Sequence, residues 1–356
     1  MTVGIGIFGA GSIARVHAQA LKDLGHQVVG FYDIDADKAA DAAAAFGAKA
    51  WSDSEAMLSS DDVTAVVVAV PNLYHAPLAM QAMEAGCDVL LEKPMAMSSD
   101  QCDEVIATRD RTGRTLQIGF VCRFAATVVA ARRHIAAGRL GKIYQSRAVM
   151  LRRRGIPGLG RWFTDKATSG GGVLIDLGPH LVDLILHLTD RPAVERVSAA
   201  TSSCFVAPAY EYKFTDMWAG PPNPDGVFDV DDGATAMLRC AGGMTVTLET
   251  AWASHLPDGT IADGVTLFGE RGSMHFDIWG NSVLIGTQLD GEIVDVTHPI
   301  PDGEGWGTAF QREHACFNAN CSSPSASGPP AEDGRDVQRV LEAMYRSAES
   351  GQECAV

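Results

Sequence analysis

The sequence lacks paired cysteines, long apolar runs and an excess of positive charge. Its eight cysteines form no CxxC pair and lie in apolar surroundings, which is typical of reduced thiols and not of a disulfide framework. No segment approaches the ~20 apolar residues that a membrane-spanning helix requires. Lys and Arg number 28 against 44 Asp and Glu, a formal charge of −16, which repels phosphate backbones and anionic membrane surfaces. We therefore expect neither nucleic acid nor membrane as a partner.

The start of the chain argues against export. It has no basic segment, its apolar run is short, and it leads directly into a glycine-rich turn, unlike a secretory signal. With 46% hydrophobic residues in 356 positions, the chain can bury a sizeable core, and its length favours two domains over one. We expect a cytoplasmic protein with domains at 1–122 and 123–356.

Short β-rich runs alternate with helical segments through the first third of the chain. Five runs are almost continuously apolar, as strands covered on both faces are: 3–9 (VGIGIFG), 28–33 (VVGFYD), 65–70 (AVVVAV), 88–92 (DVLLE) and 115–121 (TLQIGFV). Most helix-like segments between such runs end at a glycine. The pattern predicts an α/β fold with a doubly wound parallel sheet, the Rossmann arrangement.

A GxGxxA motif follows the first of these strands and opens a helix. Gly9 permits a tight turn, Gly11 lets the backbone approach a pyrophosphate, and the N–H groups at Ser12 and Ile13 can bind the anion. Asp33 ends the second strand, where a carboxylate accepts hydrogen bonds from ribose hydroxyls. Because no Arg or Lys follows closely, NAD is favoured over NADP. A βα turn without any ligand, with Asp33 capping the next helix, is the alternative.

Two further loops follow later strands of the same sheet. Ligands bind beyond the carboxyl ends of strands in open α/β sheets, so we expect both loops to border the cofactor. An isolated lysine there is usually a surface charge, but Pro94 restricts the backbone after Lys93 and Glu92 supplies a neighbouring negative charge. The cofactor-binding candidates that this position gives in the two loops are Pro71, Glu92 and Lys93.

Residues 170–188, GGGVLIDLGPHLVDLILHL, are apolar except for Asp176, His180, Asp183 and His187. At 3.6 residues per turn their spacing predicts one stripe along a helix. We interpret Asp176 and His180 as the edge of an active site, and Asp183 and His187 as polar residues satisfied within a core. A divalent metal site is not favoured, because such sites usually recruit ligands from several elements. Asp183 could also support His180.

Together these motifs resemble the Gfo/Idh/MocA oxidoreductases, the family of glucose-fructose oxidoreductase and inositol dehydrogenase. The resemblance implies a nicotinamide-dependent enzyme whose C-terminal α/β domain is built on a large, mostly antiparallel sheet. The matching stretches are GxGxxA at 9–14, PNLYHAPLAMQAMEAG at 71–86, EKP at 92–94, GF and RF within 119–124, and GGGVLIDLGPH at 170–180.

The resemblance also assigns residues. Lys93, Asp176 and His180 match the family's catalytic lysine and Asp-x-x-x-His pair, and the bond after Lys93 is expected to be cis. Asn72 and His75 match residues that lie near the cofactor in the family. We hypothesise that His180 exchanges the hydroxyl proton, that Lys93 holds the oxygen, and that Asp176 binds a neighbouring hydroxyl or orients the other two. Arg123 is a further substrate-binding candidate. Trp162 falls where family members place an aromatic ring beside the nicotinamide or the substrate.

The implied function is transfer of a hydride between NAD and a secondary alcohol carbon of a cyclic polyol, sugar or glycoside. Two alternatives remain open. One is an NAD-dependent glycoside hydrolase that oxidises a sugar transiently and eliminates the glycoside, and the other is a non-catalytic dinucleotide-binding sensor. Net NADH production separates the first function from the hydrolase, and the intact catalytic set argues against the sensor.

The second half of the chain changes pattern. From about residue 140 longer runs alternate between apolar and polar residues, and the segment 265–277 is one of them; such runs predict antiparallel strands. CAGGMT at 240–245 predicts a hairpin. The loop at 207–232 is rich in proline, glycine and aromatic residues, and could shape a substrate pocket or reach a neighbouring subunit.

Helices are expected to cover one face of this second sheet. They are predicted from about 177, near 308–320 and near 335–348. The other face has no obvious cover, which motivates a homo-oligomer, a dimer or tetramer packed sheet on sheet. A monomer with a polar outer face is the alternative.

Overall fold

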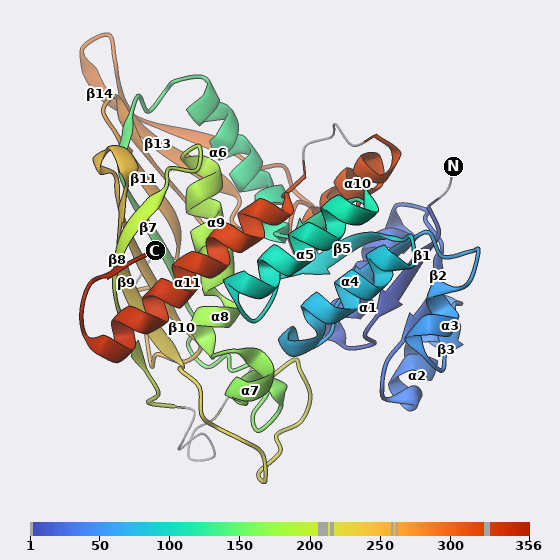
Figure 1. The fold of residues 1–356 in the computed structure, drawn as a ribbon. Coiled ribbons are helices and arrows are strands. Elements are labelled where there is room, and N and C mark those ends of the chain that lie inside the picture. The colour runs from blue at the N-terminus through green and yellow to red at the C-terminus, as the bar shows by residue number, and fades with distance from the viewer. Residues whose placement is uncertain (1–2, 206–212, 214–216, 258, 261–262, 324–327) are drawn as a thin grey trace. The chain divides into compact units, whose positions relative to one another are not determined.

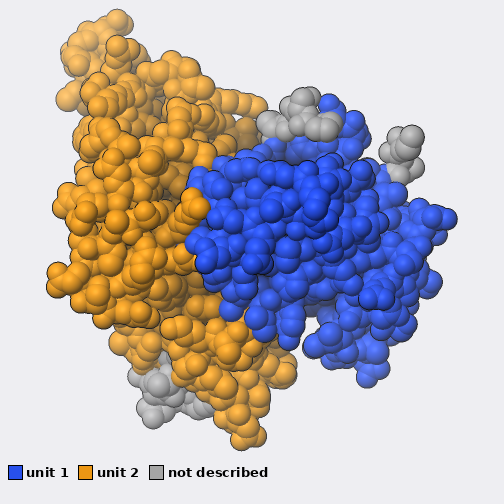
Figure 2. All heavy atoms as spheres, viewed as in Figure 1, with its two compact units in different colours: residues 1–121, 307–338 blue, residues 122–306, 339–356 orange. Residues whose placement is uncertain are grey.

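The computed structural model describes residues 3–205, 213, 217–257, 259–260, 263–323 and 328–356 (Figure 1). Its contacts divide the chain into two compact units, which Figure 2 colours separately. The first unit comprises residues 1–121 and 307–338, and the second comprises residues 122–306 and 339–356. The expected domains at 1–122 and 123–356 stay a prediction. By its contacts, the segment 307–338 groups with the first unit.

The first unit contains a six-stranded sheet in the order β3-β2-β1-β4-β5-β6, and every neighbouring pair is parallel. This confirms the doubly wound parallel sheet. The short edge strand at 49–51 is half exposed and was not predicted, because it lacks an apolar run. The strands are β1 (Ile5–Phe8), β2 (Val28–Tyr32), β3 (Lys49–Trp51), β4 (Ala65–Val68), β5 (Asp88–Glu92) and β6 (Leu116–Gly119).

Helices follow these strands in turn (Figure 1). Two of them, α2 and α5, end at the left-handed glycines Gly47 and Gly113, as the sequence pattern predicts. The helices of the first unit are α1 (Ser12–Asp23), α2 (Ala36–Phe46), α3 (Ser54–Leu58), the 3₁₀ turn η1 (Asn72–Tyr74), α4 (His75–Glu84), α5 (Ser99–Thr112), α10 (Trp306–Ser322) and the start of α11 (Ala331–Ser350).

Helix α10 belongs to the core of the first unit. Its Phe317 is fully buried in a cluster with Ile5 and Ile7 of β1 and with Ala14 and Ala18 of α1. The expectation that the 308–320 helix covers the second sheet is therefore wrong. Sequence periodicity shows which face of a helix is apolar but not which sheet that face meets.

The second unit is built on a nine-stranded sheet in the order β14-β13-β12-β11-β7-β10-β9-β8-β15. Its pairs are antiparallel except for β7 with β10, which confirms the mostly antiparallel expectation. The strands are β7 (Ile143–Leu151), β8 (Val194–Ser202), β9 (Gly233–Cys240), β10 (Thr245–Ala251), β11 (Gly264–Gly269), β12 (Gly272–Phe276), β13 (Ser282–Leu289), β14 (Glu292–Pro299) and β15 (Cys354–Ala355).

The hairpin predicted at 240–245 is present. Strands β9 and β10 pair antiparallel across the turn η5 (Ala241–Gly243), where Gly242 and Gly243 have φ of 76° and 83°. Such positive φ values cost glycine little. Residues alternate along β9 between buried and exposed, so one face of the sheet lies in the core.

The remaining helices of the second unit are short, apart from α6 and α9. They are η2 (Val121–Phe124), α6 (Ala126–Ala136), η3 (Trp162–Thr164), α7 (Lys166–Ser169), α8 (Val173–Asp176), α9 (Gly178–Leu188) and the later part of α11. Within the described ranges no single helix is both long and apolar enough to cross a membrane, although the bent pair 166–176 and 178–188 reaches that length and composition together. Much of the loop expected at 207–232 falls outside the described residues.

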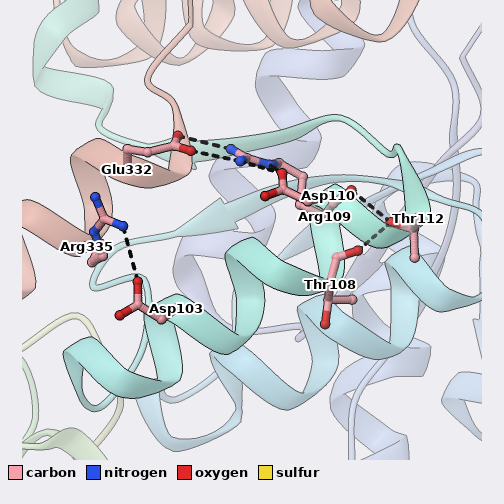
Figure 3. Close-up of polar contacts among 7 residues, drawn as sticks. All are labelled: Asp103, Thr108, Arg109, Asp110, Thr112, Glu332 and Arg335. Carbon is pink, nitrogen blue, oxygen red and sulfur yellow. Dashed lines mark hydrogen bonds and ion pairs between the residues drawn. The ribbon is translucent and has the colours of Figure 1, made fainter.

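Two ion pairs connect helices of the first unit that are distant in sequence (Figure 3). Arg109 of α5 donates to both carboxylate oxygens of Glu332 at 3.0 and 2.8 Å, and also pairs with Asp110. Arg335 contacts Asp103 at 3.2 Å. The hydrogen bonds from Arg109 lower the pKa of Glu332 below its ordinary value. These contacts join the start of α11 to α5.

We predict a small stabilising effect of the bidentate pair. Replacing Glu332 with Gln should lower the free energy of unfolding by about 0.5–1 kcal/mol, since the pair is partly exposed. A carboxylate whose folded pKa is lowered stabilises at pH above its unfolded pKa. The difference between wild type and variant should therefore shrink as pH falls through the lowered folded pKa. Urea denaturation at several pH values measures it.

Glu84→Gln is the matched control for this variant. Its pair with Arg111 is more than half exposed on both sides and should contribute less. An equal loss in the two variants would contradict the role given to the Arg109 contact.

Candidate active site

The glycine turn after β1 has the geometry of an anion-binding loop. Gly9 has a φ of 97°, and a Cβ there would lie 2.2 Å from the carbonyl oxygen of Ala69, so only glycine fits. A Cβ at Gly11 would meet no atom within 4 Å. Gly11 caps α1 without a side-chain hydrogen bond, and the first N–H groups of a helix have no intrahelical acceptor. The open space at Gly11 and the N–H groups of Ser12 and Ile13 therefore suit a pyrophosphate.

Asp33 lies beside this turn, directly after β2. Its Oδ2 accepts from the N–H of Ala10 at 2.8 Å and its Oδ1 accepts from the N–H of Asp35 at 2.9 Å. These bonds fix the carboxylate next to the glycine turn and leave it lone pairs for a ribose hydroxyl. The nearest following cation, Lys38, pairs with Asp35 at 3.2 Å. The arrangement fits NAD.

The loop after β4 carries the next candidates. Pro71 precedes η1, and Asn72 is 6% exposed within it. His75 begins α4 and is buried, with Nδ1 2.7 Å from the carbonyl oxygen of Pro94 and Nε2 2.9 Å from that of Val70. Burial lowers the pKa of His75. His75 thus ties the loop after β4 to the loop after β5.

Lys93 lies in the turn that follows β5, and the Lys93–Pro94 bond is cis, as the resemblance implied. Glu92 is 8% exposed. Its Oε2 accepts from the backbone N–H of Lys93 at 3.1 Å, and its Oε1 lies 2.9 Å from Nε2 of His17. The carboxylate therefore holds the backbone of this turn from one side, while His75 holds it from the other.

In the second unit, Asp176 ends α8 and is 8% exposed. Its Oδ2 accepts a hydrogen bond from the indole N–H of Trp252 at 2.9 Å and lies 4.0 Å from Arg152. Trp252 itself is fully buried. A buried indole is a rigid donor, because its only polar atom points in one direction. Trp252 therefore fixes the orientation of the Asp176 carboxylate.

Helix α8 is in turn held by Asp231, which precedes β9. The Asp231 carboxylate accepts from the N–H groups of Gly172 and Leu174, both at 2.9 Å, and from the Tyr345 hydroxyl at 2.7 Å. A Cβ at Gly172 would lie 1.7 Å from the carbonyl oxygen of Asp231, which explains the glycine. Sequence reasoning missed both Asp231 and Trp252, since a lone residue in a strand-like run gives no sign of its partner.

The four polar residues from Asp176 to His187 do not share one helix, as their spacing suggested, but the helix expected from about 177 is confirmed as α9. Leu177 separates α8 from α9, and the segments on its two sides are bent by 46°. Pro179 lies in the first turn of α9. It has no N–H to donate to the carbonyl of Ile175, and its ring would clash with that carbonyl in a continuous helix, which accounts for the break. Asp176 thus stands at the end of one helix and His180 in the first turn of the next.

His180 is partly exposed, and its Nδ1 lies 3.5 Å from the Sγ atom of Cys122. Asp183, one turn further, is 1% exposed and forms a two-bond ion pair with Arg123 at 2.8 and 2.5 Å. Asp183 is thus a satisfied buried residue, as expected. Arg123 supports α9 through this pair, and its role toward a substrate stays a prediction.

Trp162 begins η3 and stacks on Phe163 with ring centroids 3.7 Å apart. Its place beside a nicotinamide or substrate stays a prediction. Among the described residues, the four polar side chains from Asp176 to His187 do not form a metal-ligand group. The one such group found there comprises His17, Glu92 and Glu313 of the first unit.

These features define an NAD-dependent oxidoreductase with a Rossmann domain. The model of the oxidoreductase family with an NAD-binding Rossmann fold matches residues 3–120, and that of the GFO/IDH/MocA C-terminal domain matches residues 128–275. The chain therefore belongs to the Gfo/Idh/MocA oxidoreductase family. The resemblance seen in the sequence is confirmed.

Relatives of known activity lie within this family. The D-glucoside 3-dehydrogenase of Escherichia coli (strain K12) is 32% identical over 98% of this chain and 95% of its own length. GenD2 from gentamicin A biosynthesis, solved in complex with NAD, is 26% identical with a TM-score of 0.80, covering 99% of this chain and 96% of that one. Levoglucosan dehydrogenase, solved with NADH and levoglucosan, has a TM-score of 0.87 at 21% identity over the full length of both chains, which shows the shared fold.

We predict that Gly11→Val weakens NAD binding without unfolding the protein. Gly11 has extended backbone angles, which valine adopts readily, and the added side chain would occupy the open space at the helix start. We expect the Kd for NAD to rise about tenfold or more, equivalent to ~1.4 kcal/mol, while the melting temperature without NAD stays unchanged. Titration calorimetry and thermal melting measure the two quantities.

Gly9→Ala serves as the contrasting variant. Its positive φ and the 2.2 Å approach to Ala69 predict a lower melting temperature even without NAD. Unchanged NAD affinity in Gly11→Val would exclude the glycine turn as the pyrophosphate site.

Proposed function

We propose that the protein transfers a hydride between NAD and a secondary alcohol carbon of a sugar, cyclic polyol or glycoside. The observation that carries this proposal is that Lys93, Asp176 and His180 are all present in a chain 32% identical, over nearly its whole length, to a D-glucoside 3-dehydrogenase. Removing a hydride from a secondary alcohol also requires a group that takes the hydroxyl proton and a group that stabilises the oxygen. These three side chains have the chemistry for both tasks.

Lys93 is proposed to hold the substrate oxygen. Its ammonium group would stabilise negative charge that develops as the hydroxyl loses its proton. Two contacts of the first unit support this role, because Glu92 accepts from the Lys93 N–H and His75 binds the Pro94 carbonyl. A lysine on a turn fixed from two sides loses less freedom when it binds.

His180 is proposed to exchange the hydroxyl proton. Imidazole titrates in the physiological range, and contact of Nδ1 with Cys122 favours Nε2 as the atom that meets the substrate. Asp176, whose orientation Trp252 fixes, would bind a neighbouring hydroxyl or orient the other two groups. When bound, NAD supplies the hydride acceptor in the direction of alcohol oxidation.

The other residues are proposed to contact either the cofactor or the substrate. Gly9, Gly11, Ser12, Ile13 and Asp33 would hold the pyrophosphate and ribose of NAD. The remaining residues proposed to contact the cofactor are Pro71, Asn72, His75, Glu92 and Trp162, and Arg123 is proposed to contact the substrate.

We predict that purified protein mixed with NAD forms NADH, read as absorbance at 340 nm, with one class of compound in a panel of inositols, monosaccharides and glycosides. Lys93→Met and His180→Asn should each lower kcat on that substrate by about 100-fold or more, since each removes a group that acts on the reacting oxygen or proton. NAD binding should persist in His180→Asn.

His187→Asn provides the control on the same helix. His187 lies two turns beyond His180 in α9 and is partly buried, and its replacement should leave kcat within about twofold of wild type. Full turnover in His180→Asn would overturn the proton-exchange role. NAD binding without NADH formation across the panel, accompanied by glycoside cleavage, would indicate the hydrolase instead.

We further propose that the protein is a cytoplasmic homo-oligomer, a dimer or tetramer that packs through the second sheet. None of the eight cysteines, all within the described ranges, forms a disulfide, which suits a reducing compartment. One face of the sheet carries a row of directly paired residues across six strands, in which Met237 and Leu284 are 38% and 47% exposed. The row consists of Met237, Thr247, Arg147, Thr266, His275 and Leu284.

We predict that Met237→Glu combined with Leu284→Glu lowers the molar mass in solution, because carboxylates buried in a sheet-on-sheet interface lose their hydration. Light scattering after gel filtration measures it. Ile34→Glu, at a loop residue 88% exposed in the first unit, is the control and should keep the wild-type mass. A monomeric wild type would contradict the proposal.

A further inference from the structure

Four ionisable side chains meet inside the first unit, beneath the turn that carries Lys93. They come from three elements: His17 from α1, Glu92 from the end of β5, and Glu313 and His314 from α10. Their exposures are 0%, 8%, 0% and 0%. We call these residues the buried His-Glu cluster.

The cluster forms a continuous chain of hydrogen bonds that ends at the lysine. Nε2 of His314 lies 2.9 Å from Nδ1 of His17, and Nε2 of His17 lies 2.9 Å from Oε1 of Glu92. The other oxygen of Glu92 accepts from the backbone N–H of Lys93 at 3.1 Å. Each link is within hydrogen-bond distance.

The direction of the chain follows from the carboxylate. An ionised carboxylate can only accept, so Nε2 of His17 carries the proton and donates to Glu92. With one proton on each ring, Nδ1 of His17 accepts and Nε2 of His314 donates. Burial lowers the pKa of His314 well below its ordinary value, which agrees with a neutral His314.

Glu313 completes the charge balance. Neither of its carboxylate oxygens has a hydrogen-bond partner, and it offers an oxygen within 4.8 Å of the facing atoms of Glu92 and His17. Two neighbouring buried carboxylates do not both ionise. Burial first, and the charge of Glu92 second, raise the pKa of Glu313 well above its ordinary value. Glu313 therefore holds a proton, and Glu92 carries the single negative charge.

A divalent cation is the other occupant that could balance two buried carboxylates. It would need Nε2 of His17 as its nitrogen ligand, and that atom is engaged with Glu92. The other ring nitrogen of His17 faces His314. The contacts therefore favour a proton on Glu313 over a metal ion.

We propose that His17 is a positioning residue for Lys93, acting through Glu92, that His314 holds His17 in this arrangement, and that a protonated Glu313 leaves Glu92 as the one charged carboxylate of the cluster. The proposal rests on the function proposed above, in which Lys93 holds the substrate oxygen. His17 belongs to none of the motifs that mark the site in the sequence. It reaches the site only because α1 and α10 pack against β5.

The test uses the rate at which acetic anhydride labels Lys93, followed by mass spectrometry from about pH 7 to about 11.5, a range wide enough to contain the titration midpoint of a lysine side chain. His17→Leu removes the donor to Glu92, which disfavours the ionised form of that buried carboxylate and weakens the negative charge beside Lys93. The pH midpoint of labelling should therefore move down. With any substrate that the NADH assay identifies, kcat should fall about tenfold or more, with a smaller change in KM for NAD.

His17→Gln is the conservative variant, because it keeps an N–H donor on a side chain of similar reach. Compared with His17→Leu, it should bring both the pH midpoint of labelling and kcat most of the way back to the wild-type values. If His17 mattered only for packing, restoring an N–H donor would not have this effect. It also keeps the test valid if His17→Leu does not fold.

The Glu313→Gln variant distinguishes a proton on Glu313 from a divalent cation bound in the cluster. Glutamine keeps the shape of a protonated glutamate, so Lys93 labelling and kcat should stay near wild type. A carboxyl whose folded pKa is raised makes the native state less stable as pH rises from its ordinary pKa toward the raised one. The melting temperature of Glu313→Gln should therefore fall less than that of wild type as the pH rises over this interval. The titratable groups that face Glu313, namely Glu92, His17 and His314, are the same in both proteins.

Each outcome decides the question. An unchanged Lys93 midpoint in His17→Leu would overturn the positioning role. A stoichiometric divalent metal in wild type, measured by plasma mass spectrometry and lost in Glu313→Gln, would replace it with a metal site. Labelling requires no substrate, so a shifted midpoint beside a wild type inactive on the whole panel would reject the proposed function and leave the link from His17 to Lys93 standing.

Discussion

The arrangement of the first unit depends on one buried carboxylate. Glu92 accepts from the backbone N–H of Lys93 with one oxygen and contacts His17 with the other. A carboxylate taken out of water is stable only when its lone pairs are satisfied. The strand end, the first helix and helix α10, which supplies the partner of His17, must therefore be in place together. The position of Lys93 is thus a property of the whole packed unit.

In the second unit, hydrogen bonds between distant residues also hold a buried carboxylate in place, but the residues are different. Asp231 accepts from two backbone N–H groups at the start of α8, and the indole of Trp252 donates to Asp176 at its end. Helix α8 has four residues, too few to be stable alone. Its stability comes from these tertiary contacts and from the apolar cluster of Trp252 with Val173 and Leu177. The carboxylate of Asp176, which we propose acts in catalysis, is therefore presented by an element that exists only in the folded protein.

Much of the architecture could be predicted from local patterns. Apolar runs located five strands of the parallel sheet, and the paired glycines after Cys240 located the hairpin. The predictions failed where the pattern was too short or the partner too distant. Strand β3 has three residues and no apolar run. The spacing from Asp176 to His187 suggested one helix, but Pro179 cannot continue a helix from α8, and the two helices meet at Leu177.

The sequence by itself determined the fold class, the glycine turn for a dinucleotide, and the family to which Lys93, Asp176 and His180 belong. These features depend on contacts within a few residues or on motifs of fixed spacing, so they are visible along the chain. Only the tertiary structure decided that α10 joins the first unit, that His17 supports Glu92, and that Trp252 orients Asp176. His17 and Glu92 are 75 residues apart in the sequence, and Trp252 and Asp176 are 76 residues apart. A side chain's position in the sequence does not indicate which distant group will satisfy it, because that pairing is set by packing.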